Sequence, residues 1–145
     1  MGRSRGLRTR TTRLRAVLDT NVLLGADRDH FLFAAQFKLF GLVWSDFIEA
    51  EMRRVMRRMY WNRDRGEVLI GKIGRIAERV DHRQITGGNY DVWLTDPDDH
   101  PIMATALAGK VDYIVTSNTK DFPPKKRFAG ITILTPDAFL RLLEG

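Results

Sequence analysis

Four short apolar runs stand out along the chain, and a polar residue follows each of them. The runs are Ala16–Leu18, Leu42–Trp44, Tyr113–Val115 and Ile131–Leu134. A continuous apolar run of this length predicts a strand that is buried on both faces of a sheet. Between the runs, apolar residues mostly recur at helical spacing, so strands are expected to alternate with helices. This alternation predicts parallel strand pairing with right-handed crossovers.

The expected helices occupy the segments between these strands. They lie at residues 21–40, 48–59, 68–80, 98–107 and 136–143. Asp29 is a possible cap where one helix of the first segment ends and another starts, and Gly109 is a plausible C-cap. We therefore expect an α/β fold, a three-layer α/β/α sandwich with a central parallel sheet.

Three of the four strands are followed at once by a polar residue that could reach a ligand. Asp19, Ser45 and Thr116 are those residues. An open α/β sheet binds its ligand at the carboxyl ends of its strands. The pattern therefore brings these polar groups to one edge of the predicted sheet.

Acidic and amide residues gather in four places that this fold can bring together. They are Asp19–Asn21, Glu49 with Glu51, Asp96–Asp99, and Asn118 with Asp121. Several carboxylates in one pocket repel one another, and a divalent cation removes that cost. Hard oxygen ligands favour Mg²⁺ or Mn²⁺ over zinc. Carboxylates with such an ion are sufficient for phosphodiester hydrolysis.

Each of these residues also has a purely structural interpretation. Asp19 or Asn21 could cap the helix that follows. Glu49 and Glu51 border the apolar stripe of their helix on opposite sides, so periodicity cannot choose between them. Asp99 faces the core side of its helix, which is unusual for an acid without a partner, so it is the strongest single candidate.

Composition and charge exclude several classes of protein and indicate where the charge lies along the chain. The chain has no cysteines, which excludes a disulfide scaffold and a cysteine zinc site. No apolar run is long enough to span a bilayer and no secretory signal is recognised, so we expect a soluble, cytoplasmic protein without membrane contact. Six arginines and no acids fall within residues 1–15, and the remainder holds 18 basic and 18 acidic residues. We expect residues 1–14 to form a basic arm, either inert or attracted to phosphate, and residues 15–145 to form the domain.

A second basic cluster lies on the expected helix at residues 48–59. It consists of Arg53, Arg54, Arg57 and Arg58. A solvated helix face is the favoured interpretation, and a weak contact to RNA phosphates or to an acidic partner is the alternative. The three histidines show no metal-ligand spacing.

The order and spacing of five segments resemble the PIN-domain family, and within it the VapC-like toxins of toxin–antitoxin systems. The segments are residues 16–24, 44–52, 96–106, 114–123 and 130–140. The resemblance covers nearly everything from Arg15 to Leu143. It implies a ribonuclease that depends on Mg²⁺ or Mn²⁺, an RNA substrate, and a cognate antitoxin as partner. A homodimer is the default oligomer.

Matched to the family pattern, the acids that hold the metal are Asp19, Glu51 and Asp99. The fourth family position is often Asp but is Asn118 here, so Asp121 could supply the missing charge. Asn118 and Thr116 are expected to orient ligand or water, and Ser45 to support the edge. Asn21 is expected to brace the strand–helix turn.

Two other classes of function compete with the nuclease. A phosphoryl-accepting α/β domain needs further acids close to the first strand, and Asn21 occupies one of those places. A non-catalytic RNA- or protein-binding module with a degenerate metal site is favoured only by Asn118. Metal-dependent RNA cleavage separates that module from an enzyme.

Overall fold

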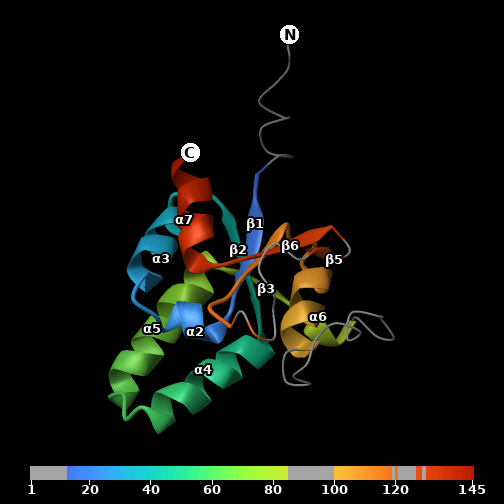
Figure 1. The fold of residues 1–145 in the computed structure, drawn as a ribbon. Helices are drawn as coiled ribbons and strands as arrows, with labels where there is room; N and C mark the ends of the chain where they lie inside the picture. Colours follow the sequence, from blue (N-terminus) through green and yellow to red (C-terminus); the bar gives the residue numbers. More distant parts are fainter. Residues whose placement is uncertain (1–12, 85–99, 119, 121–126, 129) are drawn as a thin grey trace.

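The computed structural model describes residues 13–84, 100–118, 120, 127, 128 and 130–145. Within them, strands and helices alternate along most of the chain (Figure 1). Their order is β1 (Arg15–Leu18), α2 (Thr20–Leu23), α3 (Arg28–Gln36), β2 (Gly41–Ser45), α4 (Asp46–Arg58), α5 (Arg63–Ile76), β3 (Glu78–Val80), the 3-10 helix η1 (His82–Gln84), α6 (His100–Ala108), β4 (Tyr113–Val115), β5 (Arg127–Phe128), β6 (Ile131–Leu134) and α7 (Pro136–Glu144).

The strands form one sheet in the order β3-β2-β1-β4-β6-β5. Five strands run parallel, and only β5 pairs antiparallel, with β6. Helices α3 and α7 lie on one side of the sheet and α6 on the other (Figure 1). This arrangement confirms the predicted three-layer α/β/α fold with a central parallel sheet.

The core forms where the apolar runs of the sequence lie. Ala16, Val17 and Leu18 of β1 are almost fully buried, as expected for a central strand covered on both faces. On the α3 and α7 side, the Phe139 ring lies 5.7 Å from Phe31 and 5.0 Å from Phe40, measured between ring centroids. These contacts fix α7 against α3.

Two strands of the structure, β3 and β5, were not predicted because they have no apolar run, and one predicted helix is too long. The spacing predicts a helix through Val80, but α5 ends at Ile76 and β3 follows it. Strand β3 is an edge strand with exposed Glu78 and Arg79, so it lacks the apolar run that marks a central strand. Strand β5 is the opposite edge and has only two residues.

Several helix ends also differ from the prediction. Helix α3 begins at Arg28, and Asp29 lies in its first turn, so Asp29 is not the cap. Met59 is 59% exposed just beyond α4 and does not belong to its buried face. One helix end agrees with the prediction, because α6 ends at Ala108 and Gly109 follows it as the C-cap. A side chain on Gly109 would meet Val43, so this glycine also permits close packing. The left-handed residue of that turn is Lys110, with φ 51°.

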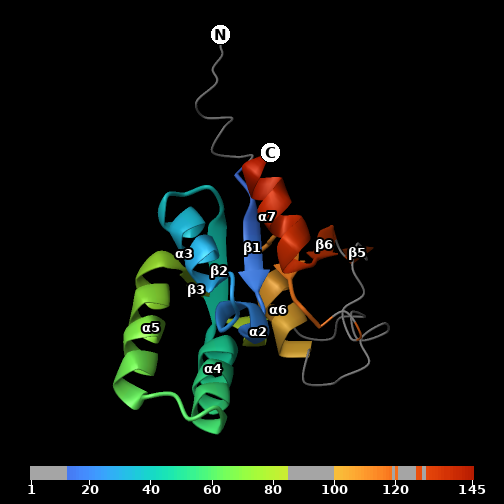
Figure 2. The ribbon, with the colours of Figure 1, turned by 60° about the vertical axis from the view of Figure 1, so that its left-hand side comes forward.

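Helices α4 and α5 form an antiparallel hairpin that projects beyond the carboxyl ends of the strands. Figure 2 shows the two helices side by side, joined by a short turn at their far end. Residues 59–62 form this turn. The hairpin therefore places α4 beside the edge of the sheet at which a ligand is expected.

Two further predictions concern the basic N-terminal arm and contact with a membrane. Residues 1–12, which make up most of the predicted basic arm, lie outside the described residues. Among the described helices, none combines the length and the apolar character needed to cross a bilayer.

Candidate active site

Asp19 lies at the carboxyl end of β1, in the middle of the sheet. Its backbone N–H donates to the carbonyl of Val115 at 2.9 Å, which ties it to the end of the neighbouring strand β4. Its side chain caps the short helix α2 by accepting from the Thr20 N–H at 2.8 Å. The residue is only 8% exposed. The predicted convergence of polar residues at this edge therefore includes a buried carboxylate.

Burial dominates the electrostatics of Asp19. Desolvation raises the pKa of its carboxyl above the ordinary value, because the charged form loses water. Hydrogen bonds from Thr116, Thr20 and Asn21 lower the pKa again, but only in part. The three hydrogen bonds come from neutral donors, so in the described structure none of them neutralises the carboxylate charge.

Thr116 connects Asp19 with Asn118. The Thr116 hydroxyl donates to Asp19 Oδ2 at 2.8 Å, and its oxygen accepts from the Asn118 N–H at 2.9 Å. Asn21 makes a parallel link, since its amide donates to Asp19 Oδ2 at 3.2 Å and accepts from the Ser117 N–H at 3.2 Å. The loop after β4 is thus held against the loop after β1.

Asp19 opens into a pocket of about 450 Å³ at the carboxyl edge of the sheet. Glu51, Asn118 and Arg58 line this pocket together with Asp19. Its apolar wall comes from Leu24, Phe47, Val55, Met59 and Ile102. Thr20 also lines it, and the buried Thr20 hydroxyl has no hydrogen-bond partner among the described atoms. The pocket is therefore a place where oxygen ligands converge.

The structure places Glu49 and Glu51 in different surroundings. Glu51 lines the Asp19 pocket and forms an ion pair with Arg54, which is half exposed. Glu49 points to the outer side of α4, where Arg53 and Arg79 each approach it to 2.5 Å. Burial raises the pKa of Glu49, but the hydrogen bonds and charges of these two arginines outweigh it and lower the pKa. Glu49 is a structural ion-pair partner in this arrangement.

The four arginines of α4 have separate surroundings. Arg53 is held by Glu49 and by Glu67 of α5, and Arg54 pairs with Glu51. Arg58 lines the Asp19 pocket, while Arg57 lines a second pocket between α4 and α5. These residues do not form one uniform basic face. Only Arg58 shares a pocket with Asp19.

Ser45 lies at the same edge of the sheet but away from the pocket. Its hydroxyl is fully buried and lies 2.8 Å from that of Thr105. Thr105 donates its own proton to the Pro101 carbonyl at 2.7 Å, so Ser45 is the donor in this pair. Ser45 therefore fixes the first turns of α6 against β2, and it is not among the described residues that line the Asp19 pocket.

Asp99 and Asp121 lie outside the described residues. Within the described residues, no group of three or more acids or histidines is close enough to hold a metal ion. Asp99 immediately precedes α6, and Ile102 in the first turn of α6 lines the Asp19 pocket. The donor set nevertheless fits a hard divalent ion. It offers carboxylates from Asp19 and Glu51, an amide oxygen from Asn118 and the unpartnered Thr20 hydroxyl.

Sequence reasoning missed the residues that build the wall of the pocket. Phe47 lies two positions after Ser45 at the end of β2, so its place near the edge of the sheet could have been predicted. Thr20 was named only as a member of the Asp19–Asn21 cluster, without a role of its own. Met59 and Val55 were assigned to the core face of α4, although both border the pocket. No sequence pattern indicated the role of Thr105, because its hydrogen-bond partner Ser45 is sixty residues away in the chain.

No protein of established annotation matches this chain. A family model for the PIN domain matches residues 15–120, which is well over half of the chain. The match includes Asp19, Glu51, Asp99 and Asn118, and Asp121 lies just beyond it. A PIN domain implies a hydrolase of the nuclease type that acts on RNA, and PIN domains generally depend on divalent metal ions. The chain therefore belongs to the PIN domain family.

Proposed function

We propose that this protein is a divalent-metal-dependent endoribonuclease and the VapC-like toxin of a toxin–antitoxin pair. The observation that supports this best is the buried carboxylate of Asp19. It receives only neutral hydrogen bonds and opens into a pocket shared with Glu51 and Asn118. A carboxylate in this environment favours a cation as its partner.

In this proposal, Asp19, Glu51 and Asp99 hold one Mg²⁺ or Mn²⁺ ion. When bound, such an ion lowers the pKa of a water and neutralises negative charge on a phosphodiester. Thr116 and Asn21 hold the Asp19 carboxylate in a fixed orientation through their hydrogen bonds. Asn118 offers a neutral oxygen, and Asp121 adds charge if its side chain reaches the pocket.

Arg58 has a separate role toward the substrate. It lines the same pocket as Asp19. Among the described residues, Arg53 and Arg54 of α4 form ion pairs, whereas Arg57 and Arg58 form none. A guanidinium there can donate to phosphate oxygens of an RNA strand. The pocket thus carries carboxylates that attract a cation and a guanidinium that attracts the phosphate whose charge the cation neutralises.

Cleavage of RNA by the purified protein tests the enzyme function. A fluorescent single-stranded RNA should be cut in the presence of Mn²⁺ or Mg²⁺, should stay intact in EDTA, and should stay intact with Asp19→Asn. Glu49→Gln is the matched control, because it removes a carboxylate from the same edge without touching the pocket. If wild-type protein binds RNA but cuts none with either metal, the chain is a non-catalytic binding module.

Expression in a bacterial host tests the role as a toxin. Wild-type protein should slow growth, and Asp19→Ala should grow normally at equal protein levels. A protein encoded next to this one should restore growth and copurify with the wild type, as expected for an antitoxin. Light scattering of the purified protein should give twice the chain mass if it is a homodimer. Equal toxicity of Asp19→Ala would show that catalysis is not the cause.

A further inference from the structure

Tyr60 is the most exposed large hydrophobic residue in the described part of the chain, at 94%. It follows α4 in a turn closed by two hydrogen bonds. The Trp61 N–H donates to the Met56 carbonyl at 3.0 Å, and the Tyr60 N–H donates to the Arg57 carbonyl at 3.2 Å. This is a Schellman turn, whose left-handed position favours glycine. Tyr60 occupies that position with φ 59°.

Two other helices end in the same type of turn, and they provide a comparison. Lys38 after α3 and Lys110 after α6 hold the left-handed position, with φ 64° and 51°. Both lysines are exposed. The position therefore directs a side chain into water, where a charged residue is favourable. The Tyr60 ring therefore extends into solvent, where it is available for a contact outside the chain.

The surface around Tyr60 is continuous with the candidate active site. Met59 lines both the Asp19 pocket and a hollow of about 320 Å³ that also includes Tyr60. Trp61 and Asn62 line both this hollow and a pocket of about 420 Å³ between α4 and α5. The three concave regions share residues at their borders. One strand of a linear ligand can therefore run from Asp19 across the turn.

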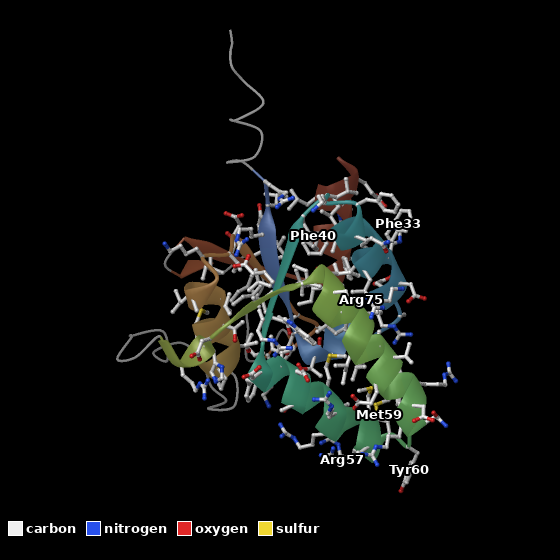
Figure 3. The ribbon with its side chains drawn as sticks, turned by 180° about the vertical axis from the view of Figure 1, so that it is seen from behind. Phe33, Phe40, Arg57, Met59, Tyr60 and Arg75 are labelled. Atoms are coloured by element: carbon white, nitrogen blue, oxygen red, sulfur yellow. The ribbon has the colours of Figure 1, made fainter. Side chains whose placement is uncertain are left out.

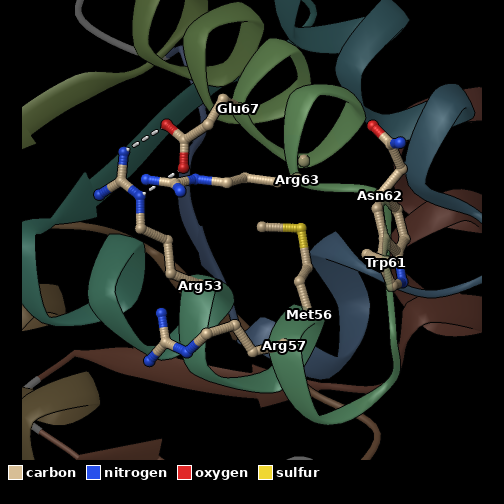
Figure 4. Close-up of a pocket in the computed structure, with 8 residues that line it drawn as sticks. Arg53, Met56, Arg57, Trp61, Asn62, Arg63 and Glu67 are labelled. Carbon is tan, nitrogen blue, oxygen red and sulfur yellow. Dashed lines mark hydrogen bonds and ion pairs between the residues drawn. The ribbon is translucent and has the colours of Figure 1, made fainter.

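The charge of this surface selects an anionic ligand. Residues 57–65 contain four arginines and one acid, Asp64. The guanidinium of Arg28 lies 5.5 Å from the centre of the Trp61 ring. Figure 4 shows Arg57 and Arg63 on the same side of the pocket between α4 and α5, with Trp61 across from them. Figure 3 shows Tyr60 at the far tip of the hairpin, pointing away from the body of the molecule.

We propose that residues 57–65, which are the α4–α5 turn and the helix ends on either side of it, bind an unpaired stretch of RNA beside the cleavage site. Aromatic rings that stack on bases, interleaved with arginines that contact phosphates, are the usual means of holding single-stranded nucleic acid. Tyr60 stacks on a base, and Arg57, Arg63 and Arg65 contact the backbone. The inference rests on the proposed function, because the bound stretch flanks the phosphodiester that enters the Asp19 pocket.

RNA binding without cleavage tests this surface directly. Fluorescence anisotropy of a labelled single-stranded RNA of mixed sequence is measured in EDTA with wild type, Tyr60→Gly and Tyr60→Phe. Tyr60→Gly removes the ring and suits the left-handed backbone, so it is expected to fold at least as well as wild type. Its Kd should rise by about tenfold, since one stacked base contributes that much. Tyr60→Phe should bind as wild type does.

Two controls establish that the ring recognises unpaired bases. Phe33→Ala removes another exposed aromatic, 62% exposed, that lines none of the three concave regions, and it should leave the Kd unchanged. An RNA duplex of the same length keeps its bases stacked internally, so Tyr60→Gly should leave its Kd unchanged. An equal loss of affinity for duplex and single strand would overturn the proposal.

Two further results would also overturn it. The first is a Kd for single-stranded RNA in Tyr60→Gly within about twofold of wild type. The second is a loss of affinity for an oligoglutamate peptide instead of RNA, which would assign the surface to an acidic protein partner. Failure of the proposed function differs from both outcomes. In that case Tyr60→Gly still weakens RNA binding, but wild-type protein cuts no RNA with Mn²⁺ or Mg²⁺.

Discussion

Charged residues have different partners at the two ends of the parallel strands, which we call the amino edge and the carboxyl edge of the sheet. At the amino edge, the Arg15 guanidinium donates to the Gly109 carbonyl at 2.9 Å and pairs with Glu78 at 2.9 Å. The backbone N–H of Arg15 is bound by the Asp112 carboxylate. At the carboxyl edge, Asp19 is more deeply buried than Arg15, Glu78 or Asp112, yet its hydrogen bonds come from neutral donors. Within the described residues, Arg15 has an acidic partner at the amino edge, whereas Asp19 has no charged partner at the carboxyl edge.

Helix α4 repeats this contrast within a single element. Its outer side joins Glu49, Arg53, Arg79 and Glu67 in a network that ties α4 to α5 and β3. Its pocket side carries Glu51 and Arg58 next to Asp19. Networks of paired charges stabilise a fold, whereas an unbalanced buried charge costs stability and is a mark of a functional site. Substitutions on the outer side of α4 should therefore affect stability, and substitutions on its pocket side should affect activity.

The largest effect is expected from one conservative change made at both edges. Asp19→Asn should lower RNA cleavage by more than about a hundredfold, since changes to residues that only support a metal ligand already cost 10–100-fold. Asp112→Asn at the amino edge keeps its acceptor oxygen and should cleave as wild type does. Cleavage rates at saturating Mn²⁺ decide this. Loss of activity in both variants, or in neither, would remove the contrast between the edges.

The two glutamates of α4 should also differ in how the same substitution affects activity and stability. Glu51→Gln is expected to reduce cleavage by on the order of a hundredfold with little change in stability. Glu49→Gln should cleave normally but lose about 1 kcal/mol of unfolding free energy, because its two arginine partners are partly exposed. Cleavage assays and urea unfolding of both variants give the answer. If Glu49→Gln is the inactive variant, the assignment of these residues is reversed.

The hydroxyl groups at the carboxyl edge offer a third comparison. Thr116→Val removes the hydroxyl that donates to Asp19 without changing its volume much, and should weaken Mn²⁺ binding and cleavage by about tenfold. Ser45→Ala leaves the pocket intact and should cost about 1 kcal/mol of stability with normal activity. Calorimetric titration of Mn²⁺ separates the two roles. An unchanged Kd for Mn²⁺ in Thr116→Val would make Thr116 a purely structural residue.

The strands show how far the fold could be predicted from sequence. The central strands β1, β2 and β4 are apolar on both faces, so their burial is visible as a continuous run. Strand β6 is interrupted by Thr132, and its burial alternates along the strand. The edge strands β3 and β5 have one neighbour each and no such run. Their positions depend on pairing with β2 and β6, which is a tertiary interaction. Local pattern could not reveal them.

The site was predictable only as far as strand ends fix it. Asp19 and Thr116 follow adjacent parallel strands, so topology alone brings them together. Glu51 and Glu49 lie on a helix whose rotation about its axis is set by packing against α2 and α5, and sequence spacing left both open. The family resemblance chose Glu51, which lines the pocket in the structure. Its role in metal binding stays a prediction, as does that of Asp99.

The smallest expected effect is a pH dependence of stability that comes from Asp19. Because burial raises the pKa of its carboxyl, the folded protein keeps a proton at pH values where the unfolded chain, with its ordinary pKa of 3.8, has lost it. The unfolded state then binds fewer protons, so the free energy of unfolding falls as pH rises from about 3.8 through the raised pKa. Glu49 acts in the opposite direction, but below its ordinary pKa of 4.5.

Comparison of wild type with Asp19→Asn isolates this contribution. In EDTA, urea unfolding from acidic to neutral pH should show a decline in stability for wild type that is absent from the variant. Because a bound cation favours the charged carboxylate, Mn²⁺ at neutral pH should raise the Tm of wild type and leave that of Asp19→Asn almost unchanged. This would show that the charge left uncompensated at the carboxyl edge is balanced from outside the chain. Parallel stability curves for the two proteins, with equal responses to Mn²⁺, would mean that Asp19 is no more than the cap of α2.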